Sequence, residues 1–436
     1  MLSAFGRVFK TADLRRKLLF TLAMIVLYRV GTFIPAPGVS YGNVQQCLNA
    51  NVTSGGVYDI VNLFSGGALL QLSIFALGVM PYITASIIIQ LLRVVIPRFQ
   101  ELHDEGAQGQ AKLTQYTRYL TIALALLNAT TIVSMARSGV LLGNCPGIIP
   151  QDDVLHILLI IVTLCAGTTV IMWMGEQITE RGVGNGMSLL IFTSIASSFP
   201  SALGSIQRTH GWGIFAAVCG IGLLVMLAVV YVEQSVRRIP VQYAKRMIGR
   251  RTIGGTNTYI PLKVNMAGVI PLIFASSLLT LPGLIAQFNT PTNGSTPPDW
   301  VNWINAYLVR GDHPLYIVLY FFMIIGFAYF YVAVTFDPVE VADNMKKYGG
   351  FIPGIRAGEP TVRYLSYVIN RVTVAGSVYL VVLALLPTLA VSRWLGLSSS
   401  LPFGGTTILI MVGVGLQTVK EINSQLQQRH YEGFLS

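Results

Sequence analysis

Ten long apolar segments divide this chain, and a helix that crosses a bilayer needs about 20 mostly apolar residues. In order, they are Leu18–Ile34, Leu72–Leu92, Tyr116–Ala136, Val154–Met174, Gly184–Phe199, Gly213–Val232, Met266–Gln287, Leu315–Phe336, Ser366–Leu386 and Phe403–Leu416. Only 11% of the residues are charged, against about 25% in soluble domains. Continuous apolar runs favour helices over the alternating pattern of a membrane barrel. The sequence therefore predicts an all-α polytopic membrane protein with ten transmembrane helices.

Two nine-residue stretches within these segments nearly repeat each other. Gly78–Ser86 reads GVMPYITAS and Gly268–Ser276 reads GVIPLIFAS, so six of nine positions are identical. They occupy the second and seventh spans, which are equivalent places in two sets of five. Five spans per set turn the second set upside down, and matched Gly/Pro-interrupted segments indicate an inverted repeat. We therefore expect two five-helix halves, residues 18–200 and 201–416, with Ile83 and Ile273 both facing the axis between them.

The basic residues orient the chain in the membrane. With the N-terminus inside and ten alternating spans, 24 of the 29 basic residues fall inside and four outside. Cytoplasmic loops carry the excess of Lys and Arg. The sequence therefore predicts that the segment 1–17 and the tail 417–436 are both cytoplasmic. The polar, basic start of the chain has no cleavage site for a signal peptide, so the first apolar segment is expected to remain as a span.

A short segment before the second span has the pattern of a half-helix that dips into the protein. The whole segment covers about residues 57–71, and the short helix within it, Val57–Gly67, ends in two glycines, which are common at helix C-termini. Irregular backbone at membrane depth needs cover from protein or a water-filled cavity. The alternative is a helix on the outer surface. Its candidate residues are Tyr58, Asp59, Ile60, Val61, Asn62, Leu63, Phe64, Ser65, Gly66 and Gly67.

Two cytoplasmic loops, 233–263 and 337–365, are long and basic, with embedded apolar and aromatic residues. One interpretation is that these basic residues are solvated and serve only to orient the chain in the membrane. The interpretation that we favour is that the two loops dock a cytosolic partner. Gly349–Arg356 reads as a hairpin tip. The candidate docking residues are Arg246, Arg250, Arg251, Lys346, Lys347 and Arg356.

The spans lack the groups that most ion-coupled transporters use. None of the 18 carboxylates lies in the middle of a span, although transporters driven by protons or sodium need ionisable groups at that depth. Arg29 lies within the first span, near its outer end, where its side chain could reach the headgroups. A pathway lined by apolar groups can exclude ions by dewetting. We expect a passive protein-conducting channel, with an inverted-repeat secondary transporter of a small solute as the alternative.

Polar residues in the repeated spans could form a weak seam between the halves. Hydrogen bonds between membrane helices contribute about 0.6 kcal/mol each on average, so such a seam could open sideways. The candidate residues are Thr84, Ser86, Gln90, Asn265, Ser276 and Ser277. No metal site, cofactor or catalytic constellation is expected from the scattered Cys and His residues. Cys47 and Cys145 both fall in outer loops, where a disulfide is chemically possible.

Nine stretches of this chain match one known family in the same order. They are Tyr28–Gly31, Asn62–Ala68, Ala76–Gln90, Gln115–Tyr119, Trp173–Ser188, Gln242–Arg246, Pro261–Ser277, Gly350–Arg356 and Phe403–Thr406. Through them the chain closely resembles the SecY/Sec61-alpha family, the channel subunits of the protein-secretion translocon. The resemblance implies an hourglass channel of two halves, hinged on the outside between the fifth and sixth spans, in the bacterial cytoplasmic membrane. It implies a lateral gate between the second and third spans on one side and the seventh and eighth on the other.

The resemblance also assigns residues and partners. The segment 58–67 corresponds to the family's plug, and Arg356 to an arginine that couples to a motor or the ribosome. Ala357 replaces the proline expected after it. The implied partners are the small subunits SecE and SecG, the SecA ATPase, the ribosome, signal sequences and nascent polypeptides, and the lipid bilayer. The implied pore ring, usually isoleucine but here with two departures, consists of Val79, Ile83, Met187, Ile191, Ile273 and Ile410.

Overall fold

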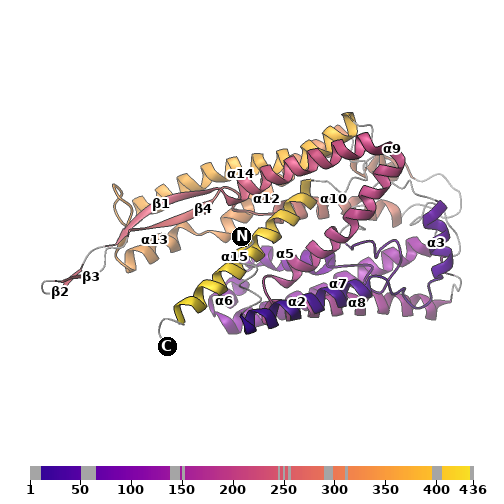
Figure 1. The fold of residues 1–436 in the computed structure, drawn as a ribbon, viewed down its shortest axis with the longest axis horizontal. Coiled ribbons are helices and arrows are strands. Elements are labelled where there is room, and N and C mark those ends of the chain that lie inside the picture. The colour runs from indigo at the N-terminus through magenta and orange to yellow at the C-terminus, as the bar shows by residue number, and fades with distance from the viewer. Residues whose placement is uncertain are drawn as a thin grey trace.

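The computed structural model describes residues 11–50, 65–137, 148–149, 153–243, 246–248, 251–253, 257–288, 298–309, 313–394 and 405–432. Helices dominate (Figure 1). The helices up to residue 234 are α2 (Ala12–Gly31), α3 (Tyr41–Ala50), α5 (Met80–Val95), α6 (Pro97–Asp104), α7 (Ala107–Arg137), α8 (Val154–Arg181) and α9 (Gly186–Gln234). Those that follow are α10 (Ile270–Phe288), α11 (Asp299–Ile304), η2 (Asn305–Val309), α12 (Pro314–Thr335), α13 (Pro338–Lys347), α14 (Glu359–Trp394) and α15 (Gly405–Glu432).

Five of the described helices are long and apolar enough to cross a bilayer, or six if the bent pair Met80–Arg93 and Pro97–Asp104 is one span. Two shorter apolar helices, Gly186–Pro200 and Ile270–Leu279, lie within the predicted fifth and seventh spans. The fifth and sixth spans follow each other within α9. Non-helical backbone at Gly211 (φ 81°, ψ 176°) forms a kink between them. This kink lies between the fifth and sixth predicted spans, where the family resemblance implies a hinge.

The second span does not begin where the sequence predicts. The expected helix starts at Leu72, but α5 starts at Met80, and residues 65–79 form a series of turns. Leu72 and Gly78 have positive φ values of 45° and 57°, which interrupt a right-handed helix. The turns are buried and bonded to the chain after α2: Ala36 N donates to Leu72 O at 2.9 Å, and Ile74 N donates to Ile34 O at 2.9 Å. Protein therefore satisfies this irregular backbone, as membrane depth requires.

Two other predicted boundaries also shift. The helix α10 begins at Ile270 instead of Met266, because Gly268 has a φ of 63° just before it. The helix α15 continues to Glu432, well past the predicted end at Leu416. The reason is packing: Ile422 and Leu426 on this extension contact Leu14 and Val183 in one apolar cluster.

The two basic loops join in one small sheet instead of forming separate tips. The strand β1 (Val236–Tyr243) pairs antiparallel with β4 (Asn257–Lys263) and with β5 (Gly350–Phe351). The predicted hairpin at 349–356 is therefore wrong: Phe351 pairs with Gln242 of the other loop. A second hairpin, β2 (Arg246–Ile248) with β3 (Arg251–Ile253), extends beyond this sheet. Figure 1 shows β1, β2, β3, β4 and α13 at one end of the molecule, with α3 at the opposite end.

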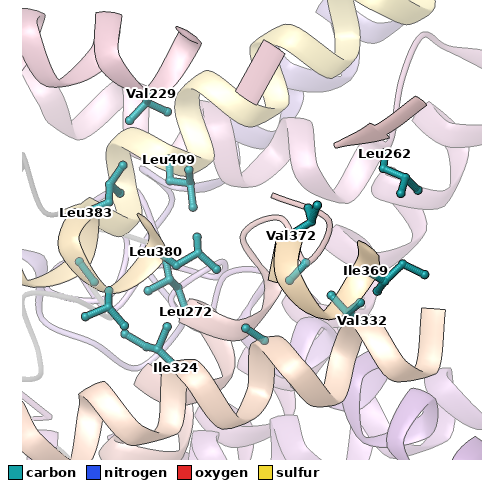
Figure 2. Close-up of a cluster of buried hydrophobic side chains, with 14 of the residues drawn as sticks. Val229, Leu262, Leu272, Ile324, Val332, Ile369, Val372, Leu380, Leu383 and Leu409 are labelled. Atoms are coloured by element: carbon teal, nitrogen blue, oxygen red, sulfur yellow. The ribbon is translucent and has the colours of Figure 1, made fainter. Parts of the chain in front are cut away.

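Most buried side chains form three large clusters. One holds the later helices together and contains residues of α9, β4, α10, α12, α14 and α15, as Figure 2 shows. A second packs α7 and α8 against the chain around α3 and the turns 65–79. The third draws side chains from α2, α5, α8, α9, α10 and α15, so it joins the two predicted halves. We call the third the central cluster.

Candidate functional site

The central cluster contains all six residues of the predicted pore ring. Val79, Met187, Ile191, Ile273 and Ile410 are among its buried members, and Ile83 is partly buried and packs against it. They come from α5 and the turn residue before it, from α9, α10 and α15, and from both predicted halves. The other buried members are Met24, Tyr28, Phe75, Ile87, Ile171, Met174, Ile178, Leu189, Leu190, Ile195 and Val414. The fold thus brings together residues that are up to 331 positions apart, since the ring runs from Val79 to Ile410.

The repeated stretches place their residues in equivalent ways. Gly78 and Gly268 have φ values of 57° and 63°, and α5 and α10 each begin two residues later, with a proline at the second helical position. Ile83 N donates to Val79 O at 3.2 Å, and Ile273 N donates to Val269 O at 3.3 Å. Both helices therefore start with the same first turn, and both turns pack in the central cluster.

Val269 is a member of this site that the sequence interpretation missed. It is the repeat counterpart of Val79 and packs against the central cluster. A Cβ added to Gly413 of α15 would lie 3.7 Å from Val269 Cγ2, so α15 passes close to this side chain. The repeat alignment itself was the signal that could have identified it.

Met187 and Ile191 lie one turn apart at the start of α9. The Asn185 side chain accepts a hydrogen bond from Ser188 N at 3.2 Å and caps this helix. Met187 packs against Gly175 of α8, where an added Cβ would lie 2.0 Å from its sulfur. Close contact with α8 thus fixes the Met187 side chain, and any larger residue at position 175 would displace it.

Five of the predicted gate residues lie on α5 and α10, which contact each other, and the side-chain hydrogen bonds of Thr84 and Ser276 stay within their own helices. Thr84 Oγ1 donates to Met80 O at 3.0 Å, and Ser276 Oγ donates to Ile273 O at 2.9 Å, so both bond to their own helices. Asn265 is buried and donates to Glu233 Oε1 at 2.7 Å, at the end of α9. Ser86 and Gln90 on α5 and Ser277 on α10 are partly buried.

Only the end of the predicted plug falls within the described residues. Tyr58–Phe64 lie outside them, whereas Ser65 and Gly66 are buried, and Gly66 and Gly67 have φ values of 69° and 89°. Arg29, which the sequence predicts could reach the headgroups, is partly buried and contacts the end of this segment. Its Nη1 donates to Gly66 O at 2.8 Å. Cys145 and the side chain of Cys47 also lie outside the described residues, so the proposed pair Cys47–Cys145 stays a prediction.

The elements β2, β3 and α13, which carry four of the predicted docking residues, lie at the end of the molecule that carries the sheet (Figure 1). Arg246 and Arg251 belong to the hairpin β2–β3, although their side chains and Arg250 lie outside the described part of the chain. Lys346 and Lys347 form the last turn of α13. Arg356 is exposed in the loop between β5 and α14. The pairing of β1 with β5 brings the two basic loops into one surface.

Comparison with known proteins identifies the family. The SecY family profile matches residues 73–419. The chain belongs to the SecY family. Protein translocase subunit SecY of Micrococcus luteus is 61% identical over 436 residues, covering all of both chains. The proteins of the same name from Streptomyces coelicolor and Mycobacterium tuberculosis are 59% and 56% identical, again over the whole of both chains.

Solved structures of channels share the fold at low identity. A structure described as a protein-conducting channel is 18% identical, with a TM-score of 0.60 over 94% of this chain and 91% of the other. Canine Sec61 in a ribosome–channel complex is 18% identical, with a TM-score of 0.58 and the same coverage. The ribosome-bound yeast Ssh1 complex is 15% identical, with a TM-score of 0.61 over 94% and 89% of the chains. The chain is therefore a membrane protein of the bacterial membrane with the SecY channel fold.

Proposed function

We propose that this chain is the channel subunit of a protein translocase, which passes unfolded secretory polypeptides across the membrane and releases apolar segments sideways into it. The observation that carries the proposal is the central cluster. Six residues from both halves meet in it, five on four helices and Val79 directly before α5, and every one is apolar. An apolar constriction excludes ions by dewetting and yields when a passing polypeptide pushes its side chains apart.

The lateral exit is proposed at the contact between α5 and α10. The hydroxyls of Thr84 and Ser276 donate within their own helices, so apolar contacts with few cross-helix hydrogen bonds hold the two helices together. Such a contact opens at low cost. The kink at Gly211 of α9 is the proposed hinge for this movement.

Both termini are proposed to lie in the cytoplasm, because 24 of the 29 basic residues then fall inside. The sheet β4–β1–β5 and the hairpin β2–β3 form the proposed docking surface for a motor ATPase or a ribosome. Two of the similar solved structures are ribosome-bound. Small membrane subunits of the SecE and SecG type are proposed to complete the complex. The transporter alternative is not favoured, since the family consists of translocase channels.

The test measures ion flow through the resting complex in planar bilayers. Ile83→Ser and Ile273→Ser should each raise the resting conductance while the protein still folds, because these side chains line a constriction. Ile324→Ser is the matched control, since Ile324 is fully buried in the cluster of Figure 2. Loss of a packed aliphatic side chain there should lower stability by about 2–5 kcal/mol without a leak. A sealed Ile83→Ser channel, destabilised like the control, would remove the assignment.

A further inference from the structure

Arg29 binds the backbone of the buried turns that lead to the constriction. Its Nη1 donates to Gly66 O at 2.8 Å and to Thr32 Oγ1 at 3.3 Å. Its guanidinium carbon lies 4.7 Å from the centroid of the Phe33 ring. Among the residues that the structure describes, no carboxylate lies within ion-pair distance of it. Within the described part of the chain, a carbonyl, a hydroxyl and an aromatic face therefore compensate this charge.

Gly66 fits this place closely. Its φ of 69° is a left-handed conformation that favours glycine. A Cβ added to it would lie 3.2 Å from Ser194 Cα and 3.2 Å from Ser197 Oγ, so its backbone lies directly against α9. The neighbour of Arg29 binds the same part of α9: Tyr28 Oη and Ser194 Oγ are 2.6 Å apart. Tyr28, Arg29, Gly66 and Ser194 thus form one contact between α2, the turns and α9, which we call the outer junction.

The turns connect the outer junction to the constriction. Residues 65–79 begin at the junction and end at Val79, which is 2% exposed in the central cluster. Tyr28 also stacks on Phe75 within these turns, with ring centroids 5.8 Å apart. A shift of Gly66 away from α9 would therefore be transmitted to Val79 over a short length of tightly packed backbone.

We propose that Arg29 is a latch that holds the turns 65–79 against α9 and so keeps the constriction closed in the resting channel. The inference rests on the proposed channel function. A charge-assisted hydrogen bond in a low-dielectric site is strong. The bond from Arg29 to Gly66 O would therefore stabilise the closed state. Arg29 is only partly buried, so its charge can turn towards water when the bond breaks. The latch can therefore open without leaving a buried, unpaired charge.

The experiment compares variants of the full chain, purified with the subunits that accompany it and placed in planar bilayers. Arg29→Met removes every donor and keeps much of the side-chain length, and it should raise resting conductance about 10-fold or more, the effect of one charge-assisted bond on an equilibrium. Arg29→Lys keeps the charge and should leak less than Arg29→Met. Arg371→Met is the matched control, because Arg371 on α14 also contacts an aromatic ring, Tyr367 at 5.2 Å, but lies outside the outer junction.

A second measurement separates a latch from a general loss of structure. Arg29→Met and Arg371→Met should each still unfold in one cooperative thermal transition in detergent, while only Arg29→Met leaks. If Arg29→Met does not accumulate, Arg29→Gln, which keeps one neutral donor, takes its place. A wild-type complex that exports protein, together with an Arg29→Met complex that seals as well as the wild type, would overturn the latch and leave the channel function intact. A wild-type complex that carries no polypeptide would instead overturn the proposed function.

Discussion

The guanidinium of Arg118 on α7 donates two parallel hydrogen bonds to the carboxylate of Glu176 on α8. Nε lies 2.9 Å from Oε1, and Nη2 lies 2.8 Å from Oε2. The side chain of Glu176 is 17% exposed and that of Arg118 is 47% exposed. This bidentate geometry fixes the two helices relative to each other in a way that a single charge–charge contact does not.

Arg118→Gln should lower the free energy of unfolding by about 1–3 kcal/mol, between the values for exposed and buried ion pairs. The loss leaves the less exposed carboxylate of Glu176 without its partner. Thermal unfolding of the purified complex measures this loss of stability. The control is Arg363→Gln, which breaks the exposed pair Arg363–Glu359 and should change stability little. Equal effects of the two substitutions would contradict the argument from burial.

Gly268→Ala should destabilise the protein by about 1–2 kcal/mol, the cost of a left-handed conformation for a residue with a Cβ. Gly268 has a φ of 63° and open space around an added Cβ, so the backbone alone causes the effect. Gly326 of α12 also has open space but lies inside a helix. Gly326→Ala should therefore leave stability unchanged or raise it by up to about 1 kcal/mol. Only Gly268→Ala should therefore lower the melting temperature relative to the wild type.

Asn265→Asp should destabilise the protein most at neutral pH. The substitution replaces the Nδ2 donor, 2.7 Å from Glu233 Oε1, with a second carboxylate. Two facing carboxylates hold a proton to a higher pH than they do in the unfolded chain, so the deficit should shrink as the pH falls. Asn265→Ala, which only leaves polar groups unsatisfied, should cost about 1–3 kcal/mol with little dependence on pH. Stability curves of both variants between neutral and acidic pH distinguish the two effects.

Arg356→Glu should leave the amount of protein in the membrane unchanged and block export driven by a cytosolic partner. The side chain is exposed, and the local loop is held through the backbone, since Thr361 Oγ1 donates to Arg356 O at 2.9 Å. Charge reversal thus affects a partner contact and not the fold. Export into inverted membrane vesicles measures it, with Lys420→Glu, an exposed cation on α15, as the control. Normal export by Arg356→Glu would exclude this residue from the docking surface.

The sequence by itself determined the elements whose signals are local. Long apolar runs predict helices because the backbone must satisfy its own hydrogen bonds in lipid. The third, fourth, eighth and ninth predicted spans therefore lie within single helices, or nearly so, as with α12 at Pro314–Thr335. The repeat predicted that the stretches at Gly78 and Gly268 would behave alike, and their shared left-handed φ values follow from two glycines in the same context. The family was also recognisable, because its motifs are continuous stretches of chain.

Only the tertiary structure decided the features that depend on contacts between distant residues. The start of α5 moved to Met80 because residues 65–79 bond to the chain after α2. β5 pairs with β1 because Phe351 lies opposite Gln242, which is 109 positions away in the other basic loop. The sequence places Arg29 near the outer end of the first span. Only the structure shows that Arg29 donates a hydrogen bond to Gly66 O. Apolar periodicity indicates that a residue is buried, but it does not indicate which residues the buried side chain contacts. The partners of a buried apolar side chain and of an isolated charge are set by how the helices pack, and no local pattern encodes that packing.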